Sequence, residues 1–295
     1  MTNRSKLLLV ALLLSSQLFA CSNPPPSANS EKPATADAAT NESVKVVALT
    51  SLTADIIHHL DDTKLVGIPG SRLIGTDQRF QDLPQVSQGR TAPDLEKIVA
   101  LKPTLVIGAK GFHDQPLSKV EDLGIATLTT EVKGWQDLIA LTEEIADQIG
   151  ADPAPLLARY QQCLSKLPAE SASTLVLVSR QPILAPNKNS WAGDLLQQFK
   201  AKNLAAELQG QSPVEGYVTL SAEKVLEANP DIVLVVDPEQ DPVTAFEAEP
   251  FWSKLKATQN KQVHAFDYYG LVNPGSIDKI LQTCNQLKQV LNIVS

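Results

Sequence analysis

The stretch from residue 135 to residue 167, WQDLIALTEEIADQIGADPAPLLARYQQCLSKL, decides the fold. Its apolar residues recur at steps of three, four or seven, which places them on one face of a helix. This face consists of Leu138, Ile145, Ile149, Leu156, Tyr160 and Leu167. Gly150, followed by Pro153 and Pro155, is a signal to stop a helix and to start another. The stretch is therefore either one kinked helix, about 50 Å long at 1.5 Å per residue, or two helices in register. In both forms we expect it to join two lobes.

Strands and helices alternate on both sides of this stretch. The predicted strands are short apolar runs, at 44–49, 64–68, 104–107 and 125–129 before it and at 174–178, 183–185, 231–236 and 263–266 after it. The predicted helices lie at 51–60, 94–101 and 117–123 before it and at 191–199, 221–228, 250–255 and 277–291 after it. Such alternation implies mostly parallel sheets covered by helices. We expect an N-terminal α/β lobe over 44–134, an interlobe helix over 135–167 and a C-terminal α/β lobe over 168–295.

A short internal repeat supports this division. Residues 96–107 align without a gap on residues 223–234, and each copy is a helix, a proline break and a buried strand. A chance match is the alternative. A true repeat places the same supersecondary unit once on each side of the interlobe stretch.

The first 43 residues differ in composition from the rest. Residues 1–20 have the basic start and short apolar run of a secretory signal, and the run is too short to span a bilayer. Residues 18–21, Leu-Phe-Ala-Cys, resemble the bacterial lipobox, in which the cysteine is lipidated. Residues 21–43 are rich in Pro, Ser, Ala, Thr and Asn and predict a disordered tether. We therefore expect an extracytoplasmic protein that lipidated Cys21 anchors to a membrane; an ordinary cleaved signal, with Cys21 incidental, is the alternative.

The remaining chain has the composition of a soluble globular protein, with 43% hydrophobic and 20% charged residues among 295. Its formal net charge is −8, and Lys and Arg are not clustered. Nucleic acid is therefore excluded as a partner, because its binding needs positive charge that displaces counterions. Nucleophile-elbow, P-loop and Gly-x-Gly-x-x-Gly motifs are absent. Ser51 is the sole nucleophile-like residue, and its position is that of a helix cap. We do not expect an enzyme.

Several segments together resemble the helical-backbone class of substrate-binding proteins of ABC importers, which serve ferric siderophores, haem and cobalamin. These segments are 46–51, 65–68, 93–107, 123–125, 220–231 and 273–275. The resemblance implies two Rossmann-like lobes joined by one rigid helix, with the ligand in the groove between them and little closure. It implies a monomer whose partners are an ABC permease and its ATPase.

The resemblance also suggests a role for the repeated carboxylates. Members of the class present one glutamate on each lobe to the permease subunits, and the matching positions are Glu96 and Glu223. Complementary charge would steer docking and set its register. The alternative is that each is an ordinary solvated glutamate beside a lysine.

The ligand should lie beyond the carboxyl ends of the parallel strands. Loops at these ends contain four arginines, whose planar forks suit carboxylate, hydroxamate or catecholate oxygens. They are Arg72, Arg79, Arg90 and Arg180. Other candidates are mainly aromatic and could pack a siderophore or a flat macrocycle. They are Lys110, Phe112, His113, Trp191, Tyr217, Tyr268 and Tyr269.

We expect the ligand to be an iron chelate of the ferric-siderophore type, with no separate cofactor. Haem or cobalamin is the alternative, with Tyr268 or His113 as an axial haem ligand. A zinc or manganese receptor is more remote, because the four histidines lack metal-ligand spacing. Cys163 and Cys284 could form a disulfide in an oxidising compartment. Cys284 matches a cysteine in cobalamin-binding relatives. The position that holds its disulfide partner in those relatives is apolar in this chain, so Cys163 would be a new partner.

Overall fold

The computed structural model describes residues 43–89, 91–167, 172–209, 212, 214–236 and 242–292. The predicted signal peptide, Cys21, the tether up to residue 42, and Arg90 lie outside these residues. The chain from residue 42 onward forms one compact unit. None of the helices in the described part combines the length and apolarity that a membrane span requires.

A four-stranded parallel sheet forms the centre of the N-terminal lobe. Its order is β2-β1-β3-β4, with β1 at Val46–Ala48, β2 at Leu65–Gly67, β3 at Leu105–Ala109 and β4 at Ala126–Thr130. Every residue of β1 is fully buried, as expected for a strand covered on both faces. The helices of this lobe are α1 (Ser51–Asp61), α2 (Arg72–Gly75), α3 (Leu95–Ala100) and α4 (Asp114–Glu121), with short 3₁₀ turns η1 (Asp62–Lys64) and η2 (Gln78–Phe80).

The C-terminal lobe has a second four-stranded parallel sheet, of order β11-β10-β5-β8. Its strands are β5 (Ser173–Leu177), β8 (Lys202–Asn203), β10 (Ile232–Val236) and β11 (Val263–Phe266). The helices are α7 (Trp191–Gln198), α8 (Ala222–Ala228), α9 (Pro242–Glu247), α10 (Lys256–Gln259), α11 (Tyr268–Leu271) and α12 (Ile277–Asn292), with the 3₁₀ turn η3 (Trp252–Lys254). The predicted class of two α/β lobes with mostly parallel sheets is confirmed.

A small antiparallel sheet is added to the C-terminal lobe. Its order is β6-β7-β9, with β6 at Ser179–Arg180, β7 at Ile183–Pro186 and β9 at Tyr217–Leu220. Of these three strands, the sequence predicts only β7. Two-residue β6 is too short to give a pattern, and β9 runs directly into the cap of α8, so its residues resemble the approach to that helix.

The two copies of the repeat form the same unit. The pair α3 and β3 corresponds to the pair α8 and β10, and each strand lies in the interior of its sheet. Asp94 caps α3 by accepting from the backbone amides of Glu96 and Lys97, and Ser221 caps α8 by accepting from that of Lys224.

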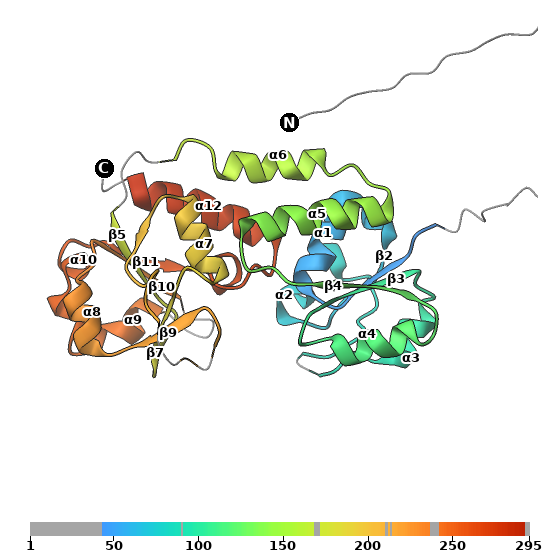
Figure 1. The fold of residues 1–295 in the computed structure, drawn as a ribbon, viewed down its shortest axis with the longest axis horizontal. Coiled ribbons are helices and arrows are strands. Elements are labelled where there is room, and N and C mark those ends of the chain that lie inside the picture. Colours follow the sequence, from blue (N-terminus) through green and yellow to red (C-terminus); the bar gives the residue numbers. More distant parts are fainter. Residues whose placement is uncertain are drawn as a thin grey trace, which may run out of the picture. The chain divides into compact units, whose positions relative to one another are not determined.

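The interlobe segment is two helices rather than one. Helix α5 spans Trp135–Ile149 and α6 spans Ala154–Cys163, and Gly150 ends α5 in the left-handed conformation at φ +70°. The chain then reverses. Tyr160 lies against the start and middle of α5, with its ring centroid 5.9 Å from that of Trp135 and its hydroxyl 3.1 Å from Thr142 Oγ1. The two helices are therefore antiparallel (Figure 1), and the expectation of a roughly 50 Å helix or of two helices in register is wrong.

One hydrophobic core runs through both lobes. It includes Ile56 of α1, Ile145 of α5, Leu195 of α7 and Leu287 of α12, all fully buried. Helix α5 packs on both α1 and α7, and α6 packs on α12. Cys163, the last residue of α6, forms a disulfide with Cys284 of α12, with the two Cα atoms 5.5 Å apart. The lobes are thus held together by the packing of helices from both of them on α5 and α6, and not only by the covalent connection.

Candidate functional site

A groove of about 1170 Å³ lies between the lobes. It begins where the central strands end: Leu49 follows β1, Lys110 follows β3 and Val178 follows β5, and all three line it. Carboxyl ends of parallel strands are where α/β folds bind ligands. The volume exceeds the roughly 300–1,000 Å³ of drug-sized sites, so the groove suits a large ligand.

The sides of the groove carry most of the aromatic residues predicted for the site. The C-terminal lobe contributes Trp191, Tyr217, Tyr268 and Tyr269, and the N-terminal lobe contributes Phe112 and His113. The rings of Tyr268 and Tyr269 meet edge to face, 5.3 Å apart at 84°. Phe112 is 86% exposed. Flat apolar surface is therefore available on both sides.

The loop that bears the two tyrosines depends on Gly270. This residue has φ +118°, and a Cβ atom there would lie 2.5 Å from the carbonyl oxygen of Lys279. Its own carbonyl accepts the indole N–H of Trp191 at 2.8 Å. At the start of α11, the Asp267 carboxylate accepts from the backbone amide of Tyr269 at 2.8 Å and from Lys279 Nζ at 2.6 Å. The tyrosines are thus held by local caps and by the buried Trp191.

Tyr217 and His113 face the groove in uncharged forms. Burial raises the pKa of the Tyr217 hydroxyl above its ordinary value, and the nearby Tyr268 adds to this effect. Burial lowers the pKa of His113, opposed by Asp114. The His113 Nδ1 atom accepts from the Ala109 backbone amide at 3.0 Å, which leaves the proton of the neutral ring on Nε2. His113 is therefore arranged to donate a hydrogen bond rather than to bind a metal.

Positive charge along the described lining of the groove is confined to Lys110, which is already paired. Its Nζ lies 3.2 Å from Glu131 Oε2. Lys133 also contacts Glu131, at 3.1 Å, and reaches Glu215 of the other lobe at 3.2 Å. Hydrogen bonds from Lys133 and Lys110 lower the pKa of Glu131. The described residues of the groove thus present little net positive charge to an anionic ligand.

The structure does not gather the predicted arginines in the groove. Arg72 on α2 and Arg180 on β6 are exposed and do not line it. Arg79 lies in a separate ion cluster, and Arg90 is outside the described residues. The rule that ligands bind beyond the carboxyl ends of parallel strands, called the strand-end rule below, locates the edge of a sheet. It does not say which way the side chains of a long loop point.

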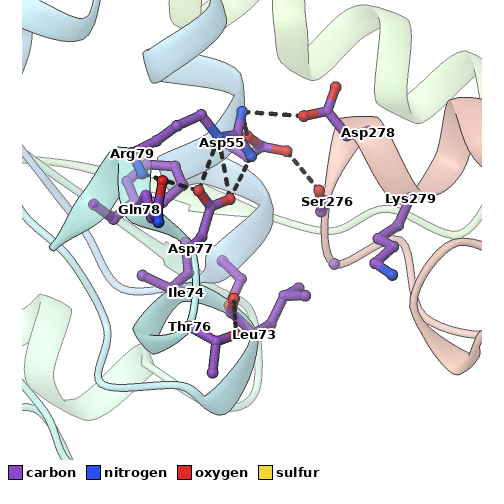
Figure 2. A pocket seen from close by; sticks show the side chains of 13 residues that line it. Asp55, Leu73, Ile74, Thr76, Asp77, Gln78, Arg79, Ser276, Asp278 and Lys279 are labelled. Carbon is purple, nitrogen blue, oxygen red and sulfur yellow. Dashed lines mark hydrogen bonds and ion pairs between the residues drawn. The ribbon is translucent and has the colours of Figure 1, made fainter.

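A second hollow, of about 520 Å³, contains Arg79 and is shown in Figure 2. Arg79 contacts Asp77 at 2.6 Å, Asp55 at 3.0 Å and Asp278 at 3.2 Å. The hydrogen bonds between Arg79 and Asp77 raise the pKa of the guanidinium and lower that of the carboxyl group. Asp55, His59 and Asp278 could place three ligand atoms within 4.8 Å of one another. The guanidinium of Arg79 supplies the positive charge that a metal ion would bring there.

Several hydroxyl residues of the groove escape prediction as ligand contacts. Ser51, Ser71 and Ser87 line its N-terminal side. The hydroxyls of Ser51 and Ser71 are 2.7 Å apart, and Ser87 Oγ accepts from the Gly70 backbone amide at 3.1 Å. Ser51 lies just after β1, so the strand-end rule could have selected it. The cap of α1 is in fact Thr50, whose side chain accepts from the Thr53 amide.

The two predicted docking glutamates are both exposed on the first turn of a short helix. Glu96 lies on α3 and Glu223 on α8. Hydrogen bonds from the backbone and from Ser221 lower the pKa of Glu223. In Figure 1, α3 and α8 belong to different lobes and lie away from the α5 and α6 pair.

A family model described as periplasmic binding protein matches residues 46–268. The chain belongs to the periplasmic binding protein family. It is a binding protein and not an enzyme, as the sequence predicts. The fold is shared with the haem-binding protein HutB of Vibrio cholerae, whose solved structure gives a TM-score of 0.71 at 22% identity, over 84% of this chain and 98% of HutB.

Curated relatives of this family member are distant. The putative ABC transporter substrate-binding lipoprotein YhfQ of Bacillus subtilis strain 168 is 25% identical over 195 residues, and the match spans 60% of each chain. The iron-uptake system-binding protein of the same organism is 23% identical, over 70% of this chain and 71% of its own. The vitamin B12-binding protein of Salmonella typhi is 25% identical, over 71% of this chain and 78% of its own.

Proposed function

We propose that this periplasmic binding protein family member captures a large metal chelate in the interlobe groove and delivers it to an ABC permease and its ATPase. We further propose that the chelate is a corrinoid of the cobalamin type. One observation carries the second proposal. The groove is rich in aromatic side chains, and its one lysine among the described lining residues, Lys110, is already paired with a glutamate.

A corrinoid matches the groove in three respects. Its flat macrocycle offers large faces to the rings of Tyr217, Tyr268 and Tyr269. Its peripheral amides can bond with the hydroxyls of the groove and with His113 Nε2–H. It carries no net negative charge, so a site in which Lys110 is already paired with Glu131 loses little by holding it. The vitamin B12-binding relative has the same kind of ligand in its name.

Haem is the second candidate, and one observation favours it. The phenol of Tyr268 or Tyr269 lies at the groove and is a side chain that can bind ferric iron. HutB, which shares the fold, is named as a haem-binding protein. The two carboxylates of haem would, however, find only Lys110 as a cation among the described lining residues.

A ferric siderophore, the ligand class that the arginines suggest in the sequence, has less support. Arg72, Arg79 and Arg180 do not line the groove, so among the described residues anionic chelate oxygens lack the paired donors that the prediction required; Arg90 lies outside those residues. One relative is named as an iron-uptake system-binding protein, so a ferric chelate is included in the titration below.

Calorimetric titration of the purified protein with cyanocobalamin, haemin and ferric dicitrate distinguishes the three ligand classes. We expect saturable 1:1 binding of cyanocobalamin with a Kd below about 1 µM, weaker binding of haemin and no heat from ferric dicitrate. Tight binding of ferric dicitrate without a response to cyanocobalamin would reverse the assignment.

The remaining proposals concern where the protein acts and what it contacts. We infer that Cys21 is lipidated and holds the protein to a membrane through the tether as a monomer. Cys21→Ser should then release the protein from the membrane fraction, and unchanged fractionation would count against the anchor. Glu96 and Glu223 are proposed to contact the permease, supported by their exposure on matching helices of the two lobes.

A further inference from the structure

A carboxylate of the N-terminal lobe caps a helix of the C-terminal lobe. Asp55 of α1 is 1% exposed. Its Oδ2 atom accepts from the Ser276 hydroxyl at 2.8 Å and from the Ile277 backbone amide at 2.7 Å. Ile277 is the first residue of α12, a helix of 16 residues, and Ser276 is 221 positions from Asp55. Asp55 thus acts as the N-cap of α12. An N-cap is normally the residue just before the helix in the same segment of chain, whereas Asp55 comes from another lobe.

The other oxygen of Asp55 faces Arg79 of η2, and Asp278 of α12 links this arginine to Arg159 of α6. Oδ1 makes no hydrogen bond, but it lies 3.0 Å from Arg79 Nη1. The same Nη1 atom lies 3.2 Å from Asp278 Oδ2 in the first turn of α12. Asp278 Oδ1 is held by Arg159 Nη2 of α6 at 2.9 Å. Elements of both lobes and of the interlobe pair therefore meet in this cluster. Figure 2 shows the contacts of Arg79 and Ser276 within it.

His59 completes the cluster. Its Nε2 atom lies 3.7 Å from Asp55 and 3.5 Å from Asp278. Its Nδ1 atom faces Arg159 Nη1 at 3.2 Å. Its Nε2 atom also faces Arg79 Nη1, at 3.5 Å, so a guanidinium group lies beside each ring nitrogen. The guanidinium groups of Arg79 and Arg159 already pair with the two carboxylates, so the cluster is an ion-pair network.

The segment that Asp55 holds continues directly into the ligand groove. Gly275 lines both the groove and the hollow around Arg79. A Cβ atom on Gly275 would lie 2.7 Å from Cδ1 of Tyr269, so the backbone there lies against the tyrosine ring. A shift of Ser276 relative to α1 would therefore change the distance between the Tyr269 side of the groove and Ser51, the first residue of α1.

We propose that Asp55 is a positioning residue that locks the N-terminal lobe to α12 and so sets the width of the groove before any ligand arrives. The lock does not depend on which chelate is bound. Asp55→Asn tests it, because the amide nitrogen of asparagine must face either Arg79 or the Ile277 backbone amide, and neither of these groups accepts a hydrogen bond. One side of the lock is lost in either orientation.

Asp77→Asn is the matched control. It removes the same charge from the same partner, Arg79, at 2.6 Å, but Asp77 makes no described contact with α12. Spin labels at Lys119→Cys on α4 and Glu227→Cys on α8, both exposed positions, would report the distance between the lobes in the ligand-free protein. A Cys21→Ser background keeps the labelling specific, and the disulfide stays oxidised.

We expect Asp55→Asn to broaden the interlobe distance distribution and to speed amide hydrogen exchange at the start of α12, while Asp77→Asn matches the wild type in both. If Asp55→Asn does not fold, Ser276→Ala takes its place, because it removes one donor and leaves every charge intact. Wild-type distributions in the folded variant, or equal broadening in Asp77→Asn, would overturn the proposal. Since the measurement uses ligand-free protein, failure here is distinct from failure of the corrinoid assignment.

Discussion

Trp135 of α5 stacks on Trp191 of α7, with ring centroids 6.1 Å apart and planes 25° apart. The backbone amide of Trp135 also donates to the Asp194 carboxylate of α7 at 2.6 Å. Trp191 in turn lines the groove and bonds the loop that carries Tyr268 and Tyr269. The contact between the two tryptophans therefore connects the interlobe helices to the ligand site, and it supports small rather than large lobe closure, because a packed core resists deformation.

Trp135→Ala should destabilise the protein by about 3–5 kcal/mol, the range for removing a buried tryptophan from a core. Urea unfolding followed by circular dichroism measures this loss. Phe112→Ala is the control, because Phe112 is 86% exposed and should change the free energy of unfolding by less than about 0.5 kcal/mol. Equal losses in the two variants would show that Trp135 is not part of the core between the lobes.

The double variant Cys163→Ala/Cys284→Ala should also lower the free energy of unfolding. The two cysteines are 121 residues apart, and a cross-link over so long a loop removes much entropy from the unfolded chain, so we expect a loss of about 2–5 kcal/mol. The groove is not lined by either cysteine, so the affinity for ligand should stay the same. A stability equal to that of the wild type under oxidising conditions would contradict this expectation.

Acid should destabilise the folded chain through its histidines. Burial lowers the pKa of His113, and likewise those of His59 and His264, in the folded state. The unfolded chain therefore takes up protons first as the pH falls below about 6.5, and stability is lost until the pH has passed the lowered pKa values. Thermal unfolding midpoints between pH 8 and pH 5 should show a plateau above pH 7 and a decline below it.

His113→Asn isolates one part of this pH dependence. An asparagine side-chain oxygen can accept from the Ala109 amide as His113 Nδ1 does, and it does not titrate. The variant should fold and show a shallower decline in acid than the wild type. A decline as steep as that of the wild type would mean that His113 does not contribute.

Charge reversal at both proposed docking positions should stop transport without affecting ligand binding. Glu96→Lys with Glu223→Lys would replace attraction to the permease by repulsion. The control is Glu143→Lys with Glu144→Lys on α5, where both glutamates are exposed but belong to the interlobe pair. Uptake of radiolabelled chelate by cells carrying each variant measures the effect, and normal uptake by the Glu96 and Glu223 variant would contradict the docking role.

Local signals in the sequence are enough to predict most of the fold. The apolar runs of β1, β3, β5 and β10 are visible because parallel strands buried on both faces read as continuous hydrophobic segments. The repeat that contains β3 and β10 indicates that the chain has two equivalent lobes. Gly150 marks the end of α5, but a left-handed cap does not fix the direction of the next helix, so the reversal into α6 is not predictable from it.

The site is predicted less well, for a physical reason. Aromatic residues that follow parallel strands, such as Phe112 after β3 and Tyr268 after β11, lie in the groove because ligand sites of α/β folds lie beyond the carboxyl ends of these strands. Arg79 points away from the groove because it pairs with Asp55 and Asp278, which are far from it in sequence and meet it only in three dimensions. Tertiary ion pairing of this kind leaves no local pattern.

The affinity of cyanocobalamin for two variants tests the central claim most directly. Tyr268 lines the groove, whereas Arg180 does not. If aromatic faces rather than arginines hold the ligand, calorimetry should give a Kd at least about tenfold higher for Tyr268→Ala, a change of about 1.4 kcal/mol, and a wild-type Kd for Arg180→Ala. A wild-type Kd for Tyr268→Ala together with lost binding in Arg180→Ala would contradict the account.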